Sequence, residues 1–280
     1  GVVPRELWKH KIEPDERNGI RMSMRAILLR GPLGASPKDE RRMLIDCGMG
    51  DGYEPAWIDR FSVRYTTPSF FERLAALGCP RESITDLICT HLHFDHCGGL
   101  VYPERPTGAA PGHRPEGLEL PLRLRCSFPN ARHHVQGAQL DHALAPTAKD
   151  RASFLRERFQ AVQDADLYQV HDGVAEVAPG VWLRPVYGHS PGMQLVEIHS
   201  GDQRWLHLAD LVPTAAHLPI PWVMAYDNHP LKTLEEKREI VVPFIEAGGI
   251  LIFEHDAATA AARVTWARGR PDTITEVPVA

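Results

Sequence analysis

Short apolar runs that end at small or polar residues predict a series of β-strands along this chain. The first two are expected to form a hairpin, and two later ones lead directly into histidines. The predicted strands are Met22–Arg30, Arg42–Asp46, Thr85–Thr90, Ala131–Val135, Tyr168–His171, Val181–Val186, Gln194–His199, Arg204–Leu208 and Ile250–Phe253.

Apolar residues at helical spacing separate some of these strands. They predict helices at Ser69–Leu77, Gln136–Leu144, Lys149–Asp164 and Leu234–Ala247. Strands and helices that alternate without a linker predict one α/β domain over residues 1–280. We expect an N-terminal arm at residues 1–20 and a long surface loop at residues 101–121, where proline and glycine disfavour regular structure.

Composition excludes several classes of protein. With 31 basic and 36 acidic residues the net charge is −5, so no overall positive field attracts nucleic acid. The longest apolar runs are far shorter than a membrane-spanning helix requires. The five cysteines form no C-x-x-C pair, which predicts reduced thiols in a cytoplasmic protein.

Histidine is abundant, with 15 residues, and four chemically useful side chains cluster in the segment TDLICTHLHFDHCGGL. His91 and His93 are two positions apart in extended backbone, so their imidazoles can face one point. Asp95 and His96 lie on the turn that follows and can reach a second point beside it. This H-x-H-x-D-H spacing predicts a metal site.

Three further polar residues each close an apolar run, as expected of ligands held by a rigid scaffold. They are His189, Asp210 and His255. Imidazole and carboxylate ligands without thiolate predict two divalent metal ions, with Zn²⁺ favoured and Fe²⁺ or Mn²⁺ also compatible. Cys97 follows His96 directly and is expected to be a small packing residue.

These motifs resemble the metallo-β-lactamase-fold hydrolase superfamily, from the first hairpin to His255. The resemblance implies an αβ/βα four-layer sandwich of two packed mixed sheets with helices outside. It also implies that His91, His93 and His189 bind the first metal ion. Asp95, His96 and His255 would bind the second, and Asp210 would bridge the two.

Two such cations can share a hydroxide that is nucleophilic at neutral pH, while one of them polarises the oxygen of the substrate. The catalytic residues are then Asp210, as the bridging ligand, and Asp95, as the group that passes a proton to the leaving group.

The HLHFDHCGG and GHSPG motifs are most similar to the lactonase branch, which opens acyl-homoserine lactones, and to its organophosphate-hydrolysing relatives. The substrate is therefore predicted to be a small ester or lactone. Thioesterases of the glyoxalase II type share these ligands and are an alternative. They are less favoured because they carry a sizeable helical domain after the bridging aspartate, whereas 45 residues separate Asp210 from His255 here and 25 follow it. A mononuclear iron enzyme similar to persulfide dioxygenases, or an inactive metal-binding scaffold, remains an alternative.

One departure from the lactonase pattern concerns substrate binding. Lactonases of the best-known type have a tyrosine about three residues after the bridging aspartate, where this chain has Pro213. His217 and Tyr226 are candidates to replace it. Phe94 and Trp222 are expected to help form an apolar wall, and core packing or a homodimer contact is the alternative for the aromatic residues.

Overall fold

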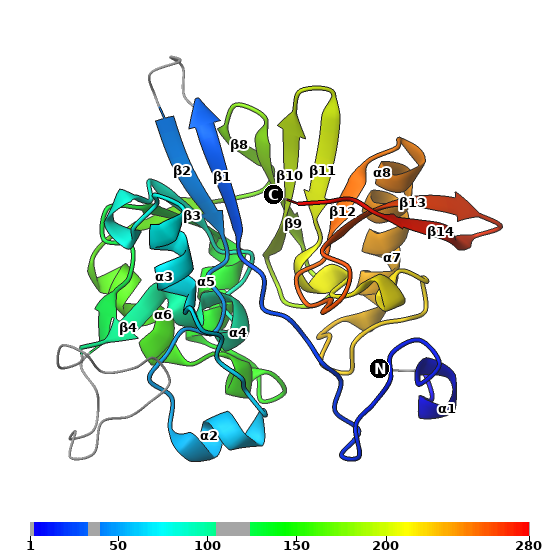
Figure 1. Cartoon of the computed structure of the whole chain (residues 1–280), viewed down its shortest axis with the longest axis horizontal. Helices are drawn as coiled ribbons and strands as arrows, with labels where there is room; N and C mark the ends of the chain where they lie inside the picture. The colour runs from blue at the N-terminus through cyan, green and yellow to red at the C-terminus, as the bar shows by residue number, and fades with distance from the viewer. Residues whose placement is uncertain (1–2, 33–39, 105–123, 280) are drawn as a thin grey trace. The chain divides into compact units, whose positions relative to one another are not determined.

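The computed structural model describes residues 3–32, 40–104 and 124–279. Its contacts divide the chain into two compact units. Unit 1 consists of Gly1–Arg25, Val135–Ala152 and Val170–Ala280, and unit 2 of Ala26–His134 and Ser153–Gln169. Both contain strands and helices, which confirms the expected mixed α/β class (Figure 1).

The sheet of unit 2 has the strand order β1-β2-β3-β6-β7, with the ends of β6 and β7 assigned to unit 1. β1 and β2 form the predicted antiparallel hairpin, and β3 lies parallel to both β2 and β6. The strands are β1 (Ile27–Pro32), β2 (Glu40–Ile45), β3 (Asp86–Ile88), β6 (Arg132–Gln136) and β7 (Tyr168–His171).

The first predicted strand began five residues too early. Residues 22–25 do not join β1, because they contact the segment that contains His255. The predicted loop at residues 101–121 also starts later than expected, because β4 (Val101–Pro103) pairs with β5 (Leu124–Cys126). The rest of that loop, apart from Glu104, lies outside the described residues.

Unit 1 contains a seven-stranded sheet with the order β14-β13-β12-β11-β10-β9-β8. β11 and β12 are parallel, and the other neighbours are antiparallel. The strands are β8 (Ala175–Ala178), β9 (Val181–Val186), β10 (Met193–Ser200), β11 (Gln203–His207), β12 (Ile250–Ile252), β13 (Ala261–Ala267) and β14 (Arg270–Glu276).

The hairpin of β13 and β14 was not predicted. Its turn, Arg268–Gly269, has positive φ at both residues, as a type I′ turn requires. Only the glycine is a residue type that signals such a turn. β14 is also mostly exposed, so its apolar pattern is weak.

Apolar side chains from this sheet form one buried cluster with residues of the C-terminal helices. Leu195, Leu206 and Leu251 come from the strands, and Phe244 and Ile245 from α8 (Val242–Glu246), which contacts β13 (Figure 1). The strand ends are thereby held on a packed core.

The longer predicted helices are present with altered limits. The helix expected at Leu234–Ala247 begins earlier, at Pro230. Proline is tolerated at the first helical position, because the N–H that it lacks would have no partner within the helix. It widens into a π-helical turn at Lys237–Val241 ahead of Pro243, which cannot donate the usual helical hydrogen bond. Of the segment predicted at Lys149–Asp164, the α-helical part is Arg156–Asp164.

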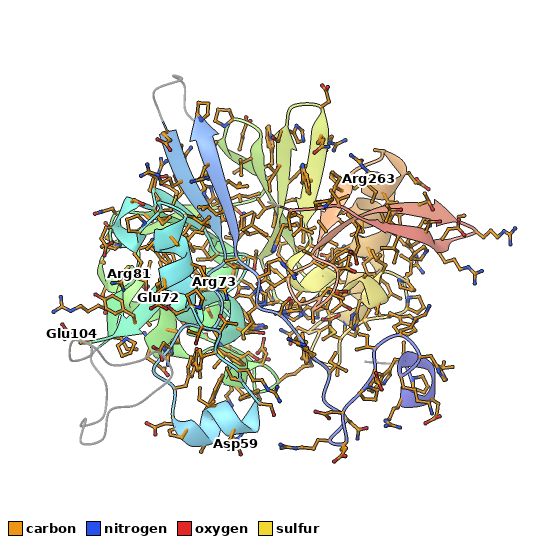
Figure 2. All side chains as sticks on the ribbon, viewed as in Figure 1. Asp59, Glu72, Arg73, Arg81, Glu104 and Arg263 are labelled. Carbon is orange, nitrogen blue, oxygen red and sulfur yellow. The ribbon has the colours of Figure 1, made fainter. Side chains whose placement is uncertain are left out.

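On α3, the predicted helix after Ser69, Glu72 and Arg73 are exposed (Figure 2), whereas Leu74 is buried. Ser69 and Glu72 form a capping box at its start. Within the described ranges, no helix is both long enough and apolar enough to cross a bilayer. The α-helices are α1 (Arg5–Trp8), α2 (Pro55–Arg60), α3 (Phe70–Ala76), α4 (Phe94–Cys97), α5 (Gly137–Leu144), α6 (Arg156–Asp164), α7 (Pro230–Glu236) and α8 (Val242–Glu246).

Candidate metal centre

The four predicted ligands of unit 2 follow the buried strand β3. His91 and His93 lie in the segment after the strand, and α4 begins immediately after His93 and carries Asp95 and His96. Nε2 of His91 is 3.0 Å from Nδ1 of His93. The ring centroids of His91 and His96 are 4.0 Å apart. The structure therefore brings the histidines of the H-x-H-x-D-H motif together.

The glycines after this motif are required by close backbone packing. A Cβ atom at Gly98 would lie 1.9 Å from the carbonyl oxygen of Met49, and one at Gly99 would lie 2.3 Å from that of Cys47. Only glycine allows the ligand segment to approach residues 47–49 this closely.

Asp46, at the end of β2, organises the same segment. Its carboxylate is buried and accepts hydrogen bonds from Thr90 N (2.8 Å) and Thr90 Oγ1 (2.6 Å). It also lies 3.0 Å from Nδ1 of His96. Since a carboxylate only accepts, it favours the tautomer of His96 with hydrogen on Nδ1 and a lone pair on Nε2. Nε2 is therefore the nitrogen available to a metal ion.

Asp95 differs from the histidines in its exposure. The side chain of His96 is fully buried, whereas that of Asp95 is 29% exposed, and the two face each other at 4.0 Å between Nε2 and Oδ2. The Asp95 carboxylate lies beside a candidate metal ligand and still reaches solvent, which suits the predicted proton transfer.

The remaining three predicted ligands lie in unit 1, each in the segment that follows a strand. His189 follows β9, Asp210 lies in the 3₁₀ turn Ala209–Leu211 after β11, and His255 follows β12. Oδ2 of Asp210 is 3.3 Å from Nε2 of His189, and its Oδ1 is 3.0 Å from Nε2 of His255. The carboxylate thus presents one oxygen to each imidazole.

The outer nitrogens of these two imidazoles each have an acceptor. Nδ1 of His189 lies 2.9 Å from Oδ1 of Asp227, and Nδ1 of His255 lies 2.7 Å from the carbonyl oxygen of Ser23. Both nitrogens therefore donate, which leaves the lone pair of a neutral imidazole on Nε2.

These hydrogen bonds test whether the site fits a metal ion. In the unprotonated state, each oxygen of Asp210 faces a lone pair on an imidazole nitrogen, and two acceptors repel at such distances. A cation on each side of the carboxylate removes the repulsion. Because all three side chains are buried, water screens them poorly. The donor set of unit 1 therefore fits a carboxylate shared by two cations.

The seven predicted ligands all fall among the histidine and acidic side chains that could hold a metal ion, together with Asp46 and Glu254. Their individual roles stay predictions. Cys97 is buried, its thiol donates to the carbonyl of Leu92 at 3.1 Å, and burial raises its thiol pKa. These features agree with a packing role and disfavour a thiolate ligand.

The four predicted substrate residues occupy two places. Phe94 belongs to an aromatic cluster of unit 2, where its ring meets that of Trp57 edge-on at 4.6 Å. His217, Trp222 and Tyr226 line a pocket within unit 1. Of these three residues, Tyr226 has a ring contact with a predicted metal ligand: the centroid of its ring lies 6.1 Å from that of His189.

Sequence reasoning missed the groups that orient the imidazoles. Asp46 could have been found, because it ends a predicted strand and its φ of 54° is unusual for a residue other than glycine. Asp227 lies in an irregular segment without a pattern. Ser23 acts through its backbone carbonyl, which any residue could supply, so its identity carries no signal.

The profile of the metallo-beta-lactamase superfamily matches residues 34–259. The match spans most of the chain and includes all seven predicted ligands, so the chain belongs to this superfamily.

Particular relatives are more distant. A probable metallo-hydrolase of Mycobacterium tuberculosis is 24% identical over 191 residues, which cover 61% of this chain and 53% of the relative. The chain thus spans about half the length of this curated relative.

Two solved structures resemble the chain over most of its length. A probable metal-dependent hydrolase from Staphylococcus aureus is 25% identical, with a TM-score of 0.82, and the match covers 100% of this chain and 91% of that one. AidC, a dizinc quorum-quenching lactonase in complex with its product, is 17% identical, with a TM-score of 0.65 and coverage of 92% and 80%. The likeness to the lactonase concerns the fold.

Proposed function

We propose that this chain is a dinuclear-metal hydrolase that cleaves an ester-type bond, with a lactone as the preferred substrate class. The observation that carries the proposal is the position of Asp210, with one oxygen toward His189 and the other toward His255. A carboxylate held in this way suits a bridging ligand.

The ligand assignment follows the superfamily pattern. His91, His93 and His189 would hold one ion, and Asp95, His96 and His255 the other, with Asp210 shared. Zn²⁺ is the proposed metal because the donors are imidazole and carboxylate groups, and because AidC is a dizinc protein. When bound, such ions would supply a hydroxide nucleophile and polarise the substrate oxygen.

The protein side chains have the remaining roles. Asp227, Ser23 and Asp46 each accept a hydrogen bond from Nδ1 of an imidazole, which would leave Nε2 of that imidazole for a metal ion. Asp95 would deliver a proton to the leaving group, and its partial exposure allows it to be reprotonated from solvent. Tyr226 is proposed to take the place of the lactonase tyrosine, because its ring lies close to His189 and its side chain is 47% exposed.

The test combines metal analysis with a substrate panel. Protein loaded with zinc is assayed for bound metal and for hydrolysis of acyl-homoserine lactones, a thioester and a phosphotriester. We expect two zinc ions per chain and the fastest hydrolysis with a lactone. A ratio below about 1.5 metals per chain in metal-replete protein would contradict the dinuclear mechanism. One iron with oxygen uptake, or no turnover of any ester, would contradict hydrolysis.

A further inference from the structure

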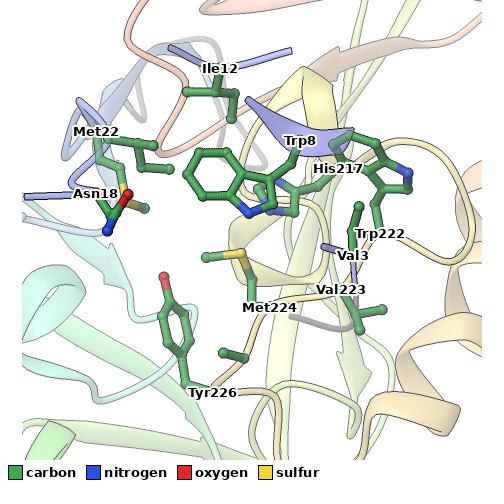
Figure 3. A pocket seen from close by; sticks show the side chains of 12 residues that line it. Val3, Trp8, Ile12, Asn18, Met22, His217, Trp222, Val223, Met224 and Tyr226 are labelled. Atoms are coloured by element: carbon green, nitrogen blue, oxygen red, sulfur yellow. The ribbon is translucent and has the colours of Figure 1, made fainter. Parts of the chain in front are cut away.

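Unit 1 contains a pocket of about 270 Å³ that its metal ligands do not line (Figure 3). One wall is the N-terminal arm, which contributes Trp8, Ile12 and Met22. The other is the segment at residues 217–226, which contributes Trp222, Met224 and Tyr226.

The chemistry of the lining selects an uncharged apolar ligand. Among the residues that the structure describes, the lining includes no lysine, arginine, aspartate or glutamate, and its polar members are Asn18, His217 and Tyr226. Its one titratable imidazole, His217, is neutral at pH 7, because burial and the nearby Lys237 lower its pKa to about 4. The volume is nearly twice the roughly 150 Å³ of an apolar cavity that accepts benzene, and it approaches the lower limit of about 300 Å³ for small-molecule sites. A medium-length alkyl or acyl group fits these limits.

Both walls are connected to predicted metal ligands of the same unit. On the arm, Met22 pairs with Asp256, and the carbonyl of Ser23 accepts from Nδ1 of His255. On the other wall, Tyr226 is followed directly by Asp227, which binds Nδ1 of His189. Because Tyr226 lines the pocket and its ring lies 6.1 Å from that of His189, a group bound in the pocket would lie near this predicted ligand.

Lys237 holds the second wall in place. Its side chain is 1% exposed, and its ammonium donates to the backbone carbonyls of four residues of the wall. The donor–acceptor distances are 2.6 Å to His217, 2.8 Å to Pro219, 3.3 Å to Ile220 and 3.0 Å to Trp222.

This arrangement ties four carbonyls of the pocket wall to one ammonium group. The carbonyls of His217 and Trp222 accept from Lys237, while the side chains of the same two residues line the pocket. An ammonium group has three N–H donors and no acceptor, so it can bind several carbonyls together. The carbonyl of Pro219 also accepts from the backbone N–H of Trp222 at 2.9 Å.

We propose that the pocket takes the uncharged apolar part of the substrate, and that Lys237 is the positioning residue that gives the pocket its shape and so selects the length of that part. The proposal rests on the hydrolase function proposed above. It assigns Lys237 no contact with the reacting atoms.

The first experiment measures binding without turnover. Straight-chain amides from butanamide to decanamide are titrated into zinc-loaded protein by calorimetry, since they carry no ester bond. We expect affinity to increase with chain length up to about octanamide. Trp8→Ala should weaken octanamide binding by about tenfold or more, while Trp182→Ala, a matched change at a half-exposed site on β9, should leave it unchanged.

The second experiment measures selectivity. We expect Lys237→Met and Trp8→Ala to raise KM for an octanoyl lactone by about tenfold, with little change for the butanoyl lactone and in bound zinc. If Lys237→Met does not fold, Lys237→Arg, which keeps the positive charge, is compared with wild type across the same chain lengths, and a shifted length preference is expected.

The outcomes separate the two proposals. Folded variants that keep the wild-type dependence of KM on chain length, or octanamide binding that Trp8→Ala does not change, would overturn this inference while lactone turnover still supports the hydrolase. Conversely, Trp8-dependent binding of octanamide without hydrolysis of any ester would support the pocket and contradict the proposed function.

Discussion

The group behind each imidazole determines which of its nitrogens can bind a metal ion. In this protein these groups are chemically varied: a carboxylate for His96, another for His189 and a backbone carbonyl for His255. Each accepts a hydrogen bond from Nδ1, so each ring presents Nε2 inward. The backbone carbonyl cannot be removed by substitution, whereas the carboxylates can.

Asp227→Asn is expected to lower zinc affinity by about 10- to 100-fold, because an amide stabilises the donating Nδ1–H of His189 less well than a carboxylate. Competition with a chromophoric chelator measures this affinity. Asp202→Asn, at an exposed turn of the same unit, is the control and should bind zinc as the wild type does. Equal affinities in all three proteins would exclude the role given to Asp227.

Asp95→Asn tests the proposed proton transfer. We expect kcat to decrease by at least about 100-fold with a poor leaving group, since the amide cannot donate the proton. Zinc content must be measured on the same samples, because Asp95 is also a proposed ligand. Full turnover with two zinc ions bound would rule out Asp95 as the proton donor.

The candidate ligands were predictable because metal binding restricts residue type and spacing together. His91, His93 and His96 stand out for this reason, and His255 stands out at the end of a strand. The orienting groups were harder to find. Asp227 lies 38 residues from His189, and Ser23 lies 232 residues from His255, so only the folded chain brings each pair together.

Two backbone elements support the site in different ways. In unit 2, the turn at Gly98–Gly99 lets the ligand segment pack against residues 47–49. In unit 1, the π-helical turn at Lys237–Val241 carries the lysine that binds the pocket wall. The glycine pair was visible in the sequence, whereas the π-turn was hidden inside an ordinary helical pattern.

Gly98→Ala should lower the free energy of unfolding by about 3 kcal/mol or more, because the added methyl group would overlap a backbone carbonyl that cannot rotate away. Gly137→Ala is the control, since its methyl group would meet the nearest side chain only at 3.4 Å. Urea denaturation of both variants checks the prediction, and similar stabilities would show that the turn can relax.

Lys237 makes stability depend on pH. Burial lowers the pKa of its ammonium in the folded chain to about 7, from an ordinary value of 10.5. Between these values the unfolded chain binds more protons, so the free energy of unfolding rises with pH.

Relative to Lys237→Met, the wild type should therefore gain on the order of 4 kcal/mol from pH 7 to pH 10.5. Urea denaturation at pH 7, 8.5 and 10 measures the difference. Parallel pH profiles for the two proteins would show that Lys237 keeps its ordinary pKa.

Across the whole chain, the sequence pattern located strands more accurately than their ends or their partners. Tyr168–His171 and Val181–Val186 have the predicted limits, because turn residues flank both. Residues 22–26 were assigned to β1, because an apolar run does not reveal which part of the molecule covers it. Contacts with residues distant in the sequence determine which part of the molecule covers such a run.

Removal of zinc is expected to destabilise the native chain, since an ion that binds only the folded state adds RT ln(1 + [L]/Kd) to its stability. At a free zinc concentration about 100 times Kd, this term is about 2.7 kcal/mol. Differential scanning calorimetry with and without a chelator, followed by zinc addition, measures it. An unchanged unfolding temperature would contradict a zinc site.

The hydrogen bond between the carbonyl of Ser23 and His255 can form only late in the synthesis of the chain. These residues are 232 positions apart, so at about 5 to 20 residues per second Ser23 is synthesised roughly 10 to 50 s before His255. During this time Trp8 and Met22 have no opposite wall, because residues 217–226 are also synthesised late. The arm is translated well before the segments that it contacts, so it can dock only after they have been made.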